Sequence, residues 1–213
     1  MITVALVQVG NYEGRGPDYV AVLRAGLRRH LRVPHQVHLL TDEAASLYPA
    51  TYCHPADASL PGWWQKLRLF KPGMFPDGDR VLYLDLDTTV VGSLDEIAAY
   101  AGDFAVLRDF YRPTGYGSGV MAWRAGSPQT AHIWDFWCAA GRPKLGGGDQ
   151  AWLECSAPGA DRLQDLFPGQ LVSYKADGCA AGVPEGARLV CFHGRPKPHE
   201  LGAPWWPEEA AAA

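Results

Sequence analysis

The sequence has no long apolar run and no paired-cysteine motif, and both absences narrow its class. No apolar stretch approaches the ~20 residues that a helix needs to cross a bilayer, so no membrane span is predicted. The five cysteines are odd in number and show no Cys-x-x-Cys spacing, which favours thiols in a reducing compartment over a disulfide framework. The first residues, MITVALVQVGNYEG, lack the basic segment of a signal peptide and are typical of a strand. We therefore expect a cytoplasmic protein.

Basic residues are also in deficit. Lys and Arg number 19 against 23 Asp and Glu, a net charge of −4, which argues against nucleic acid or an anionic membrane as the partner. A local basic site could still hold a small anion. Hydrophobic residues make up 47% of the 213 residues, which is enough to bury a sizeable core. The length suits one domain, which we assign to residues 1–205, followed by a flexible C-terminal tail at residues 206–213.

Strand-like runs alternate with helical patterns from the start of the chain. A β-rich run at residues 3–9 precedes a helix that Pro17 and Asp18 open. Apolar residues recur in this helix at four-residue spacing and form one stripe: Tyr19, Leu23, Leu27 and Leu31. A second strand is predicted at residues 36–42. Strand, helix, strand is typical of a βαβ unit and therefore of a parallel sheet.

The same patterns continue downstream. Helices are predicted at residues 62–70, 93–102 and 127–141, with another beginning at 148, and strands at residues 81–85, 104–109, 118–124 and 188–194. The helix at 93–102 has the sequence of a capping box, with Ser93 before Glu96. The sequence thus predicts a single α/β domain, Rossmann-like, with a mixed, mostly parallel central sheet flanked by helices. In such sheets ligands bind at the carboxyl ends of the strands.

Two aspartates, Asp85 and Asp87, follow an apolar strand in the segment RVLYLDLDTTVVGSL. Residues two apart in an extended backbone face the same side, so these carboxylates are expected to point together. Two unit charges ~5 Å apart repel by roughly 3 kcal/mol at an effective dielectric constant of about 20. A divalent cation removes this repulsion, and hard carboxylate oxygens suit Mg²⁺ or Mn²⁺. The alternative is a pair of solvated acids that help to begin a turn.

The segment DLDTT, residues 85–89, also fits the hhhhDxDxT motif of haloacid-dehalogenase-like phosphatases. In that alternative Asp85 is a nucleophile and Asp87 an acid/base. Such enzymes usually carry the motif near the N-terminus and need a later lysine and an acidic pair. Here a full βαβ unit precedes the motif, and GGGDQ, residues 146–150, holds a single acid.

Four further segments accompany the aspartates in a fixed order. WWQKLRLF precedes them, and YGSGVMAWR, GGGDQAWL and VCFHGRPKPHE follow. This order resembles the GT-A fold glycosyltransferases, in particular the glycogenin-like and bacterial galactosyltransferase-like members of family eight, over residues 3–200. The resemblance implies a GT-A (nucleotide-diphospho-sugar transferase) fold. It also implies hexosyl transfer, with retention, from a nucleotide sugar such as a UDP-sugar to a glycan, lipid or protein acceptor.

The resemblance implies a role for each matching residue near the donor. Asp85 and Asp87 would hold Mn²⁺ or Mg²⁺ against the diphosphate. Tyr12 matches an aromatic residue that covers the nucleotide base, with an ordinary loop tyrosine as the alternative. Lys66 matches a basic residue near the donor phosphates or sugar, with a solvated helix face as the alternative.

Two further segments match positions around the sugar. Gly117, Ser118 and Gly119 match an Asn-x-Gly turn, with glycine where asparagine is common, so backbone approach to the sugar is kept and an amide contact is not. Ser118 is thereby assigned to the donor site. Asp149 and Gln150 match the pair beside the reacting sugar and are the candidate catalytic residues. The alternative for Asp149 is the N-cap of the helix that follows the glycine run.

The late motif departs from the family. There, a His three residues before the Gly completes the metal site, and a Lys three residues after it touches phosphate. Here Cys191 takes the first position, His193 directly precedes Gly194, and Lys197 keeps its place. Since 191 and 193 would share a face of a strand, His193 is the predicted third metal ligand, because a thiolate at 191 suits Zn²⁺ better. The alternative for His193 is a buried, hydrogen-bonded histidine. Arg195 and Lys197, between prolines, form a stiff basic loop that suits a diphosphate.

Eight tryptophans are many for this length. The pairs at residues 63–64 and 205–206 could stack on sugar and line an acceptor groove, and core packing is their alternative. Trp134 and Trp137, at helical spacing, are predicted to lie in the core.

One alternative comes from another functional class. Glycine at 117 and cysteine at 191 keep open a non-catalytic module that binds a nucleotide sugar or a glycan without turnover.

Overall fold

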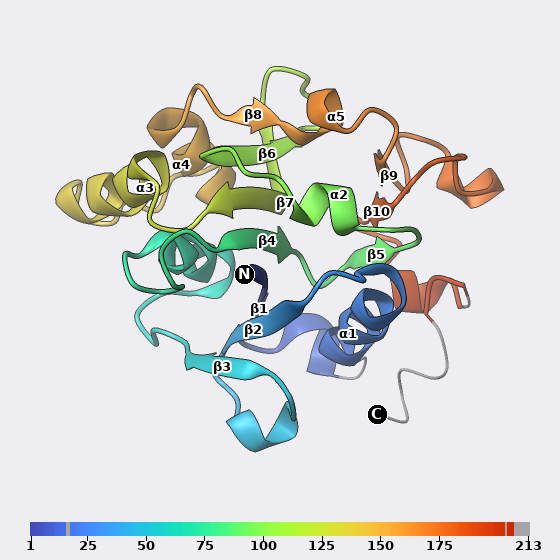
Figure 1. Ribbon diagram of the computed structural model, residues 1–213, viewed down its shortest axis with the longest axis horizontal. Coiled ribbons are helices and arrows are strands. Elements are labelled where there is room, and N and C mark those ends of the chain that lie inside the picture. Colours follow the sequence, from blue (N-terminus) through green and yellow to red (C-terminus); the bar gives the residue numbers. More distant parts are fainter. Residues whose placement is uncertain (16–17, 203, 207–213) are drawn as a thin grey trace.

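A computed structural model describes residues 1–15, 18–202 and 204–206, and its central feature is a seven-stranded sheet (Figure 1). The strand order is β3-β2-β1-β4-β7-β6-β8. The strands of this sheet are β1 (Ile2–Gln8), β2 (His35–Thr41), β3 (Tyr52–Pro55), β4 (Arg80–Leu84), β6 (Phe104–Arg108), β7 (Tyr116–Arg124) and β8 (Asp161–Arg162). A second, three-stranded sheet has the order β5-β10-β9, from β5 (Thr88–Val90), β10 (Leu189–Cys191) and β9 (Leu171–Ser173).

The first four strands of the order, β3, β2, β1 and β4, run parallel to one another. Strand β7 is antiparallel to both β4 and β6, and β8 runs parallel to β6. The sheet is therefore mixed and mostly parallel, as predicted. Its parallel part brings the carboxyl ends of β1 and β4 to one edge, where a ligand site is expected.

The first crossover helix, α1 (Tyr19–His30), joins β1 to β2. It begins where Asp18 accepts a hydrogen bond from the backbone N–H of Ala21 at 2.8 Å, a local N-cap. The predicted apolar stripe is confirmed, because each of its four residues is buried: Tyr19, Leu23, Leu27 and Leu31. Pro17, the other residue expected to open this helix, lies outside the described residues.

Helices cover both faces of the sheet, with α3 and α4 on one side and α1 and α2 on the other in Figure 1. The remaining α-helices are α2 (Asp95–Ala98), α3 (Pro128–Ala139), α4 (Gly148–Ser156) and α5 (Leu163–Leu166). Short 3-10 helices span Tyr12–Arg15, Ala45–Leu47, Gly62–Phe70, Cys179–Ala181 and Pro198–Glu200. The predicted helix at 62–70 thus forms as 3-10 turns.

Alternation along β4 supplies both cores. Leu82 and Leu84 face the core that α1 covers, whereas Val81 and Tyr83 face the core that α3 and α4 cover. Trp134 and Trp137 lie in this second core, as predicted. A strand that is buried on both faces has little freedom to shift, so it places whatever follows Leu84 firmly.

Two predicted elements are shorter in the structure. The helix expected at 93–102 is the single turn α2, and no capping box forms, because the N-cap is Leu94 rather than Ser93. Glu96 instead accepts a hydrogen bond from the side chain of Gln170. Its entry is set by tertiary packing: Leu94 is fully buried, and its N–H donates to the carbonyl of His30 at 2.8 Å. The strand expected at 188–194 ends at Cys191.

Trp206 is the first residue of the predicted C-terminal tail and the last residue that the structure describes. Trp206 is half-buried and packs edge-to-face on Tyr19, with ring centroids 4.8 Å apart. The rest of that segment, residues 207–213, lies outside the described residues. Across the part of the chain that the structure describes, no helix is both long enough and apolar enough to cross a membrane. None of the five cysteines forms a disulfide.

Candidate functional site

The two aspartates lie directly after β4, in a turn rather than an extended strand. The N–H of Thr88 donates to the carbonyl of Asp85 at 3.0 Å, which closes a turn over residues 85–88. The two side chains were predicted to align because residues two apart in a strand share a face, and this reason is wrong, since the residues lie in a turn. The turn nevertheless directs both carboxylates to the same place, since Asp85 and Asp87 both line each of two neighbouring cavities.

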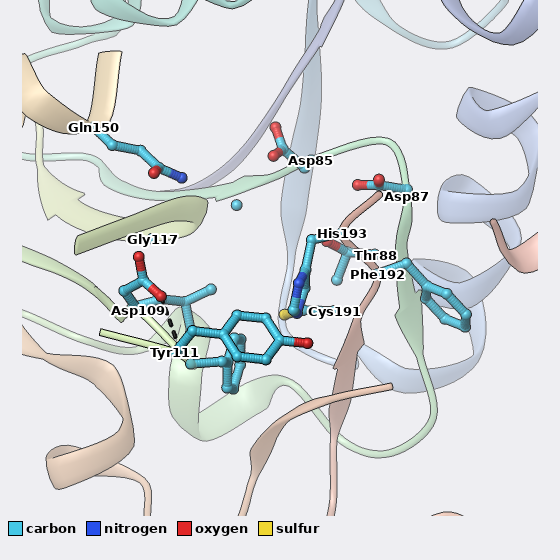
Figure 2. Close-up of a pocket in the computed structure, with 13 residues that line it drawn as sticks. Asp85, Asp87, Thr88, Asp109, Tyr111, Gly117, Gln150, Cys191, Phe192 and His193 are labelled. Carbon is cyan, nitrogen blue, oxygen red and sulfur yellow. Dashed lines mark hydrogen bonds between the residues drawn. The ribbon is translucent and has the colours of Figure 1, made fainter. Parts of the chain in front are cut away.

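Each cavity has its own character. The first, of about 250 Å³, lies between β6, β7 and the end of β10, and its lining includes Asp109, Phe110, Tyr111, Gln150, Cys191 and His193. Figure 2 shows Gln150, Asp85 and Asp87 along one side of this cavity and Tyr111 on the other. The second, of about 490 Å³, lies beyond β1, and its lining includes Val7, Val9, Asn11, Tyr12, Trp63 and Lys66. The aspartates thus stand where the two cavities meet.

Lys66, from the 3-10 helix Gly62–Phe70, pairs with the first aspartate. Its Nζ lies 2.8 Å from Oδ1 and 3.0 Å from Oδ2 of Asp85, and 3.8 Å from Oδ2 of Asp149. The side chain is not the solvated lysine of the alternative reading, because only 8% of the residue is exposed. Burial opposes its charge, but the carboxylates of Asp149 and Asp85 outweigh burial and raise the pKa of Lys66, so it is an ammonium ion.

Lys197 pairs with the second aspartate. Its Nζ forms an ion pair with Oδ2 of Asp87 and donates to the hydroxyl of Tyr12 at 3.0 Å. Lys197 is also only 8% exposed. Burial raises the pKa of Asp87, the charge of Asp85 raises it further, and Lys197 opposes both effects. Tyr12, predicted to cover a nucleotide base, lines the second cavity and so lies within reach of a ligand there.

An irregularity in β7 brings Ser118 into the site. The pairing of β6 with β7 shifts register between Val106 and Leu107, opposite residues 117–121. The hydroxyl of Ser118 accepts a hydrogen bond from Lys66 Nζ at 3.3 Å, and the N–H of Asp85 donates to the carbonyl of Gly119 at 2.8 Å. A bulge that turns a side chain into a site is a common use of such irregularities.

Asp149 and Gln150 come from the first turn of α4. The N-cap of this helix is Gly147, so the alternative role of Asp149 as the cap is wrong. Asp149 is 4% exposed, and its Oδ2 has no hydrogen-bond partner within the described residues. Burial raises the pKa of Asp149, while Lys66 opposes the rise. A buried acceptor without a donor is costly, so this oxygen suits a hydroxyl group of a bound molecule.

The predicted set of three metal ligands is not assembled. His193 hydrogen-bonds through Nε2 to the hydroxyl of Ser173 at 2.8 Å and stacks on Phe110 at 5.5 Å between centroids. Because β10 ends at Cys191, the strand argument for the two side chains does not apply, although both line the first cavity. Over residues 1–15, 18–202 and 204–206, no three His, Cys, Asp or Glu side chains converge to hold a metal ion.

Two carboxylates still suit a hard cation. Mg²⁺ and Mn²⁺ are commonly held by one or two carboxylates, with waters and phosphate oxygens in the remaining positions. The buried thiol of Cys191 is unsuited to such an ion, since burial and the charge of Asp87 raise its pKa and keep it protonated. Asp85 and Asp87 therefore fit Mg²⁺ or Mn²⁺ better than Zn²⁺.

Some residues of the site were not predicted. Tyr83 donates a hydrogen bond to Asp85 Oδ1, and its position two residues earlier in the strand could have signalled this. The segment Asp109–Tyr111 lines the first cavity directly after β6, another strand end beside β7. Trp63, of the predicted acceptor pairs, is 59% exposed and lines the second cavity, whereas Trp64 and Trp205 are buried in cores.

Comparison with known proteins places the fold. No protein-family profile and no curated protein sequence matches the chain. The glycosyltransferase GlyE of Streptococcus pneumoniae TIGR4 matches with a TM-score of 0.69 at 16% identity, over 100% of this chain and 60% of GlyE. The galactosyltransferase LgtC, solved with donor and acceptor sugar analogues, matches with a TM-score of 0.63 at 14% identity, over 99% of this chain and 93% of LgtC. Mouse xyloside xylosyltransferase 1 matches with a TM-score of 0.57 at 13% identity, over 91% of this chain and 97% of that chain.

These matches confirm the predicted GT-A-like fold. The chain spans about 60% of the length of GlyE, and the identities are too low to assign the chain to family eight.

Proposed function

We propose that the chain is a glycosyltransferase that moves a sugar from a nucleotide-sugar donor, a UDP-sugar, to a glycan, lipid or protein acceptor. The observation that carries the proposal is the position of Asp85 and Asp87 where two cavities meet, each carboxylate beside a buried lysine. The likeness in fold to glycosyltransferases supports it.

The two cavities suit the two ends of a donor. The larger one, with apolar Val7 and Val9 and the ring of Tyr12, suits a nucleoside. The aspartates and lysines between the cavities suit the diphosphate. The smaller cavity, with Gln150 and the exposed ring of Tyr111, suits the transferred sugar and the entering acceptor.

Asp85 and Asp87 would hold Mn²⁺ or Mg²⁺ in this arrangement. Such an ion supplies positive charge that stabilises the diphosphate as it departs. Transfer breaks the bond between the sugar and the diphosphate, so negative charge grows on the leaving group and positive charge on the sugar ring. The ammonium groups of Lys66 and Lys197 stabilise the first, and the carboxylate of Asp149 stabilises the second. Gln150 orients the sugar from the rim of the smaller cavity.

The stereochemical outcome is part of the proposal. The resemblance in motif order supports retention at the anomeric carbon. In enzymes that use two carboxylates, the distance between the two carboxyl groups across the sugar distinguishes retention from inversion. We assign no carboxylate as a nucleophile, because that distance is defined about a bound sugar. Analysis of the product anomer by NMR tests retention.

Transfer and donor hydrolysis test the proposal, with UDP-sugars and Mn²⁺ supplied. We expect Asp85→Asn and Asp87→Asn each to lower the rate at least ~10²-fold, the loss typical of removing electrostatic stabilisation. Asp103→Asn, which removes an exposed carboxylate paired with Arg124, is the matched control. Thermal melts show whether the variants stay folded. Full activity in EDTA contradicts the metal, and full activity of both aspartate variants contradicts the site.

The same material separates the alternatives. Release of phosphate from p-nitrophenyl phosphate, lost in Asp85→Asn, supports a phosphatase instead. Metal-dependent UDP binding by calorimetry, with no turnover over days, supports the non-catalytic module.

A further inference from the structure

The two aspartates do not stand as open carboxylates that wait for a cation. Each is in contact with a buried ammonium group: Lys66 on Asp85 and Lys197 on Asp87. The lysines come from segments far apart in the sequence, and the Lys197–Asp87 pair joins residues 110 positions apart. A metal ion that binds both aspartates must therefore compete with a cation on each.

The two lysines, the two aspartates and Asp149 form one charged cluster, and its net charge limits which ions can enter. With every group ionised, three carboxylates (Asp85, Asp87 and Asp149) face two ammonium groups, which leaves one net negative charge. A divalent cation entering alone reverses the sign of the cluster and places two ammonium groups beside a metal. A diphosphate entering alone adds negative charge beside three carboxylates. A divalent cation and the diphosphate of a nucleotide sugar carry equal and opposite charges, so together they leave the total unchanged.

Burial makes this balance matter. Lys66, Lys197, Asp87 and Asp149 are each less than a tenth exposed, so solvent screens their charges poorly. Each lysine released by a carboxylate needs a new anionic partner, because an unpaired buried charge is strongly unfavourable. The diphosphate supplies that partner, and Ser118 and Tyr12 are polar groups already hydrogen-bonded to the two lysines.

We propose that Lys66 and Lys197 act as exchangeable counter-ions of the aspartate pair, so that the site takes up a divalent cation and a diphosphate as a coupled pair and neither one well alone. This inference rests on the proposed function and adds to it a rule for the order of events. The lysines exchange a carboxylate for a phosphate oxygen when the pair enters. The metal takes the place that the lysines leave.

Equilibrium titrations of the full chain test the coupling without any turnover. Mn²⁺ binding is read from the EPR signal of the free ion, with and without saturating UDP, and UDP binding is read by calorimetry, with and without Mn²⁺. Protein-free titrations correct for the Mn²⁺–UDP complex. We expect each ligand to tighten the other by the same factor, on the order of tenfold or more. Equal Mn²⁺ affinity with and without UDP overturns the proposal, and this measurement needs no variant.

Lysine variants show whether the pairing causes the coupling. Lys197→Met removes the charge and keeps the length of the side chain, so we expect Mn²⁺ alone to bind about tenfold more tightly and the coupling factor to fall about tenfold. Lys66→Met tests the same exchange at Asp85. Lys175→Met is the matched control: this exposed lysine lies near Gly194 but forms no ion pair in the described residues, and its loss changes the net charge equally. We expect it to leave both affinities within about twofold.

The outcomes distinguish this inference from the function beneath it. If neither Mn²⁺ nor UDP binds in any combination, the proposed function fails. If both bind but Lys197→Met and Lys66→Met, shown to be folded by thermal melts, leave the Mn²⁺ affinity and the coupling factor unchanged, the counter-ion proposal fails while the proposed function stands.

Discussion

The residues of this site are charged side chains that are largely buried, so their contacts with one another determine their roles. Lys66 touches Asp85, Ser118 and Asp149, so one ammonium group organises three elements of the fold. The two carboxylates near Lys66 differ in the hydrogen bonds that they accept. Asp85 accepts from Lys66 and Tyr83, whereas Asp149 Oδ2 accepts none from the described residues. Asp149 Oδ2 is thus the acceptor still open to a ligand, and a hydrogen bond from a ligand hydroxyl would remove the cost of leaving this buried oxygen unpaired.

Asp149→Asn tests this reading. The amide keeps the shape of the side chain but loses the charge that would face the sugar ring, so we expect kcat to fall about 10²-fold. Loss of this carboxylate also makes the cluster less negative, so UDP should bind no more weakly, and the defect should appear in kcat rather than in the UDP dissociation constant. Asp135→Asn, an exposed position on α3, is the control. An equal loss of UDP affinity and of kcat would mean that Asp149 shapes the whole site rather than the sugar position.

At the scale of elements, the described helices and strands divide into those with local signals and those set by distant contacts. The start of α1 beside Asp18 and the apolar stripe on this helix have local signals, and both formed as expected. The single turn of α2 and the early end of β10 could not be predicted, since packing of Leu94 against α1 and pairing with β5 and β9 determine them. The ion pairs of the site likewise join segments far apart in sequence, which spacing does not reveal.

The cap of α1 has a measurable worth. Asp18→Ala removes the acceptor of the Ala21 N–H, so the free energy of unfolding should fall by about 1 kcal/mol. Asp18→Asn keeps an acceptor and should recover most of the loss. Urea unfolding of the three proteins measures both differences, and equal losses in the two variants would show that the cap hydrogen bond is not the cause.

Strands β2 and β3 carry a histidine pair, His38 buried and His54 half-buried, that should make stability depend on pH. His38 Nδ1 lies 2.9 Å from His54 Nε2, and burial, followed by the charge of His54, lowers the pKa of His38 to about 4. The charge of Asp79 opposes this shift only in part. Burial also lowers the pKa of His54. Because the unfolded chain has a His pKa near 6.5, it binds the proton more readily than the folded chain as the pH falls.

The sign follows from linkage. Stability from His38 is fully present above a pH of about 6.5 and is lost as the pH falls toward about 4, so unfolding should cost about 2 kcal/mol less at pH 5 than at pH 7. His38→Phe should flatten this dependence, and His132→Gln, at an exposed position of α3, should not. Urea unfolding at the two pH values measures it. An unchanged slope in His38→Phe would assign the dependence to other groups.

At the scale of the whole molecule, two sheets must keep a fixed relation for the site to exist. Asp85 directly follows β4 of the large sheet, whereas Asp87 directly precedes β5 of the small sheet. Strand β10 of the small sheet precedes the segment that carries Lys197. Helix α1 packs on both, since it covers the large sheet and meets β5 at Val90. A change at that contact therefore reaches the aspartates without touching them.

Gly26 of α1 lies at this contact, directly against Val90. A Cβ added there would lie 3.0 Å from Cβ of Val90, so even alanine forces α1 and β5 apart by a few tenths of an ångström. We expect Gly26→Val, with two further methyl groups, to lower the free energy of unfolding by about 1–3 kcal/mol and to weaken Mn²⁺–UDP binding. The double variant Gly26→Ala/Val90→Ala makes room for the new methyl group and should bind as the wild type does.

If Gly26→Val lowers stability but leaves Mn²⁺–UDP affinity unchanged, the two sheets hold the aspartates independently of α1. If affinity falls in Gly26→Val and equals that of the wild type in Gly26→Ala/Val90→Ala, the spacing between α1 and β5 is what places Asp87 beside Asp85.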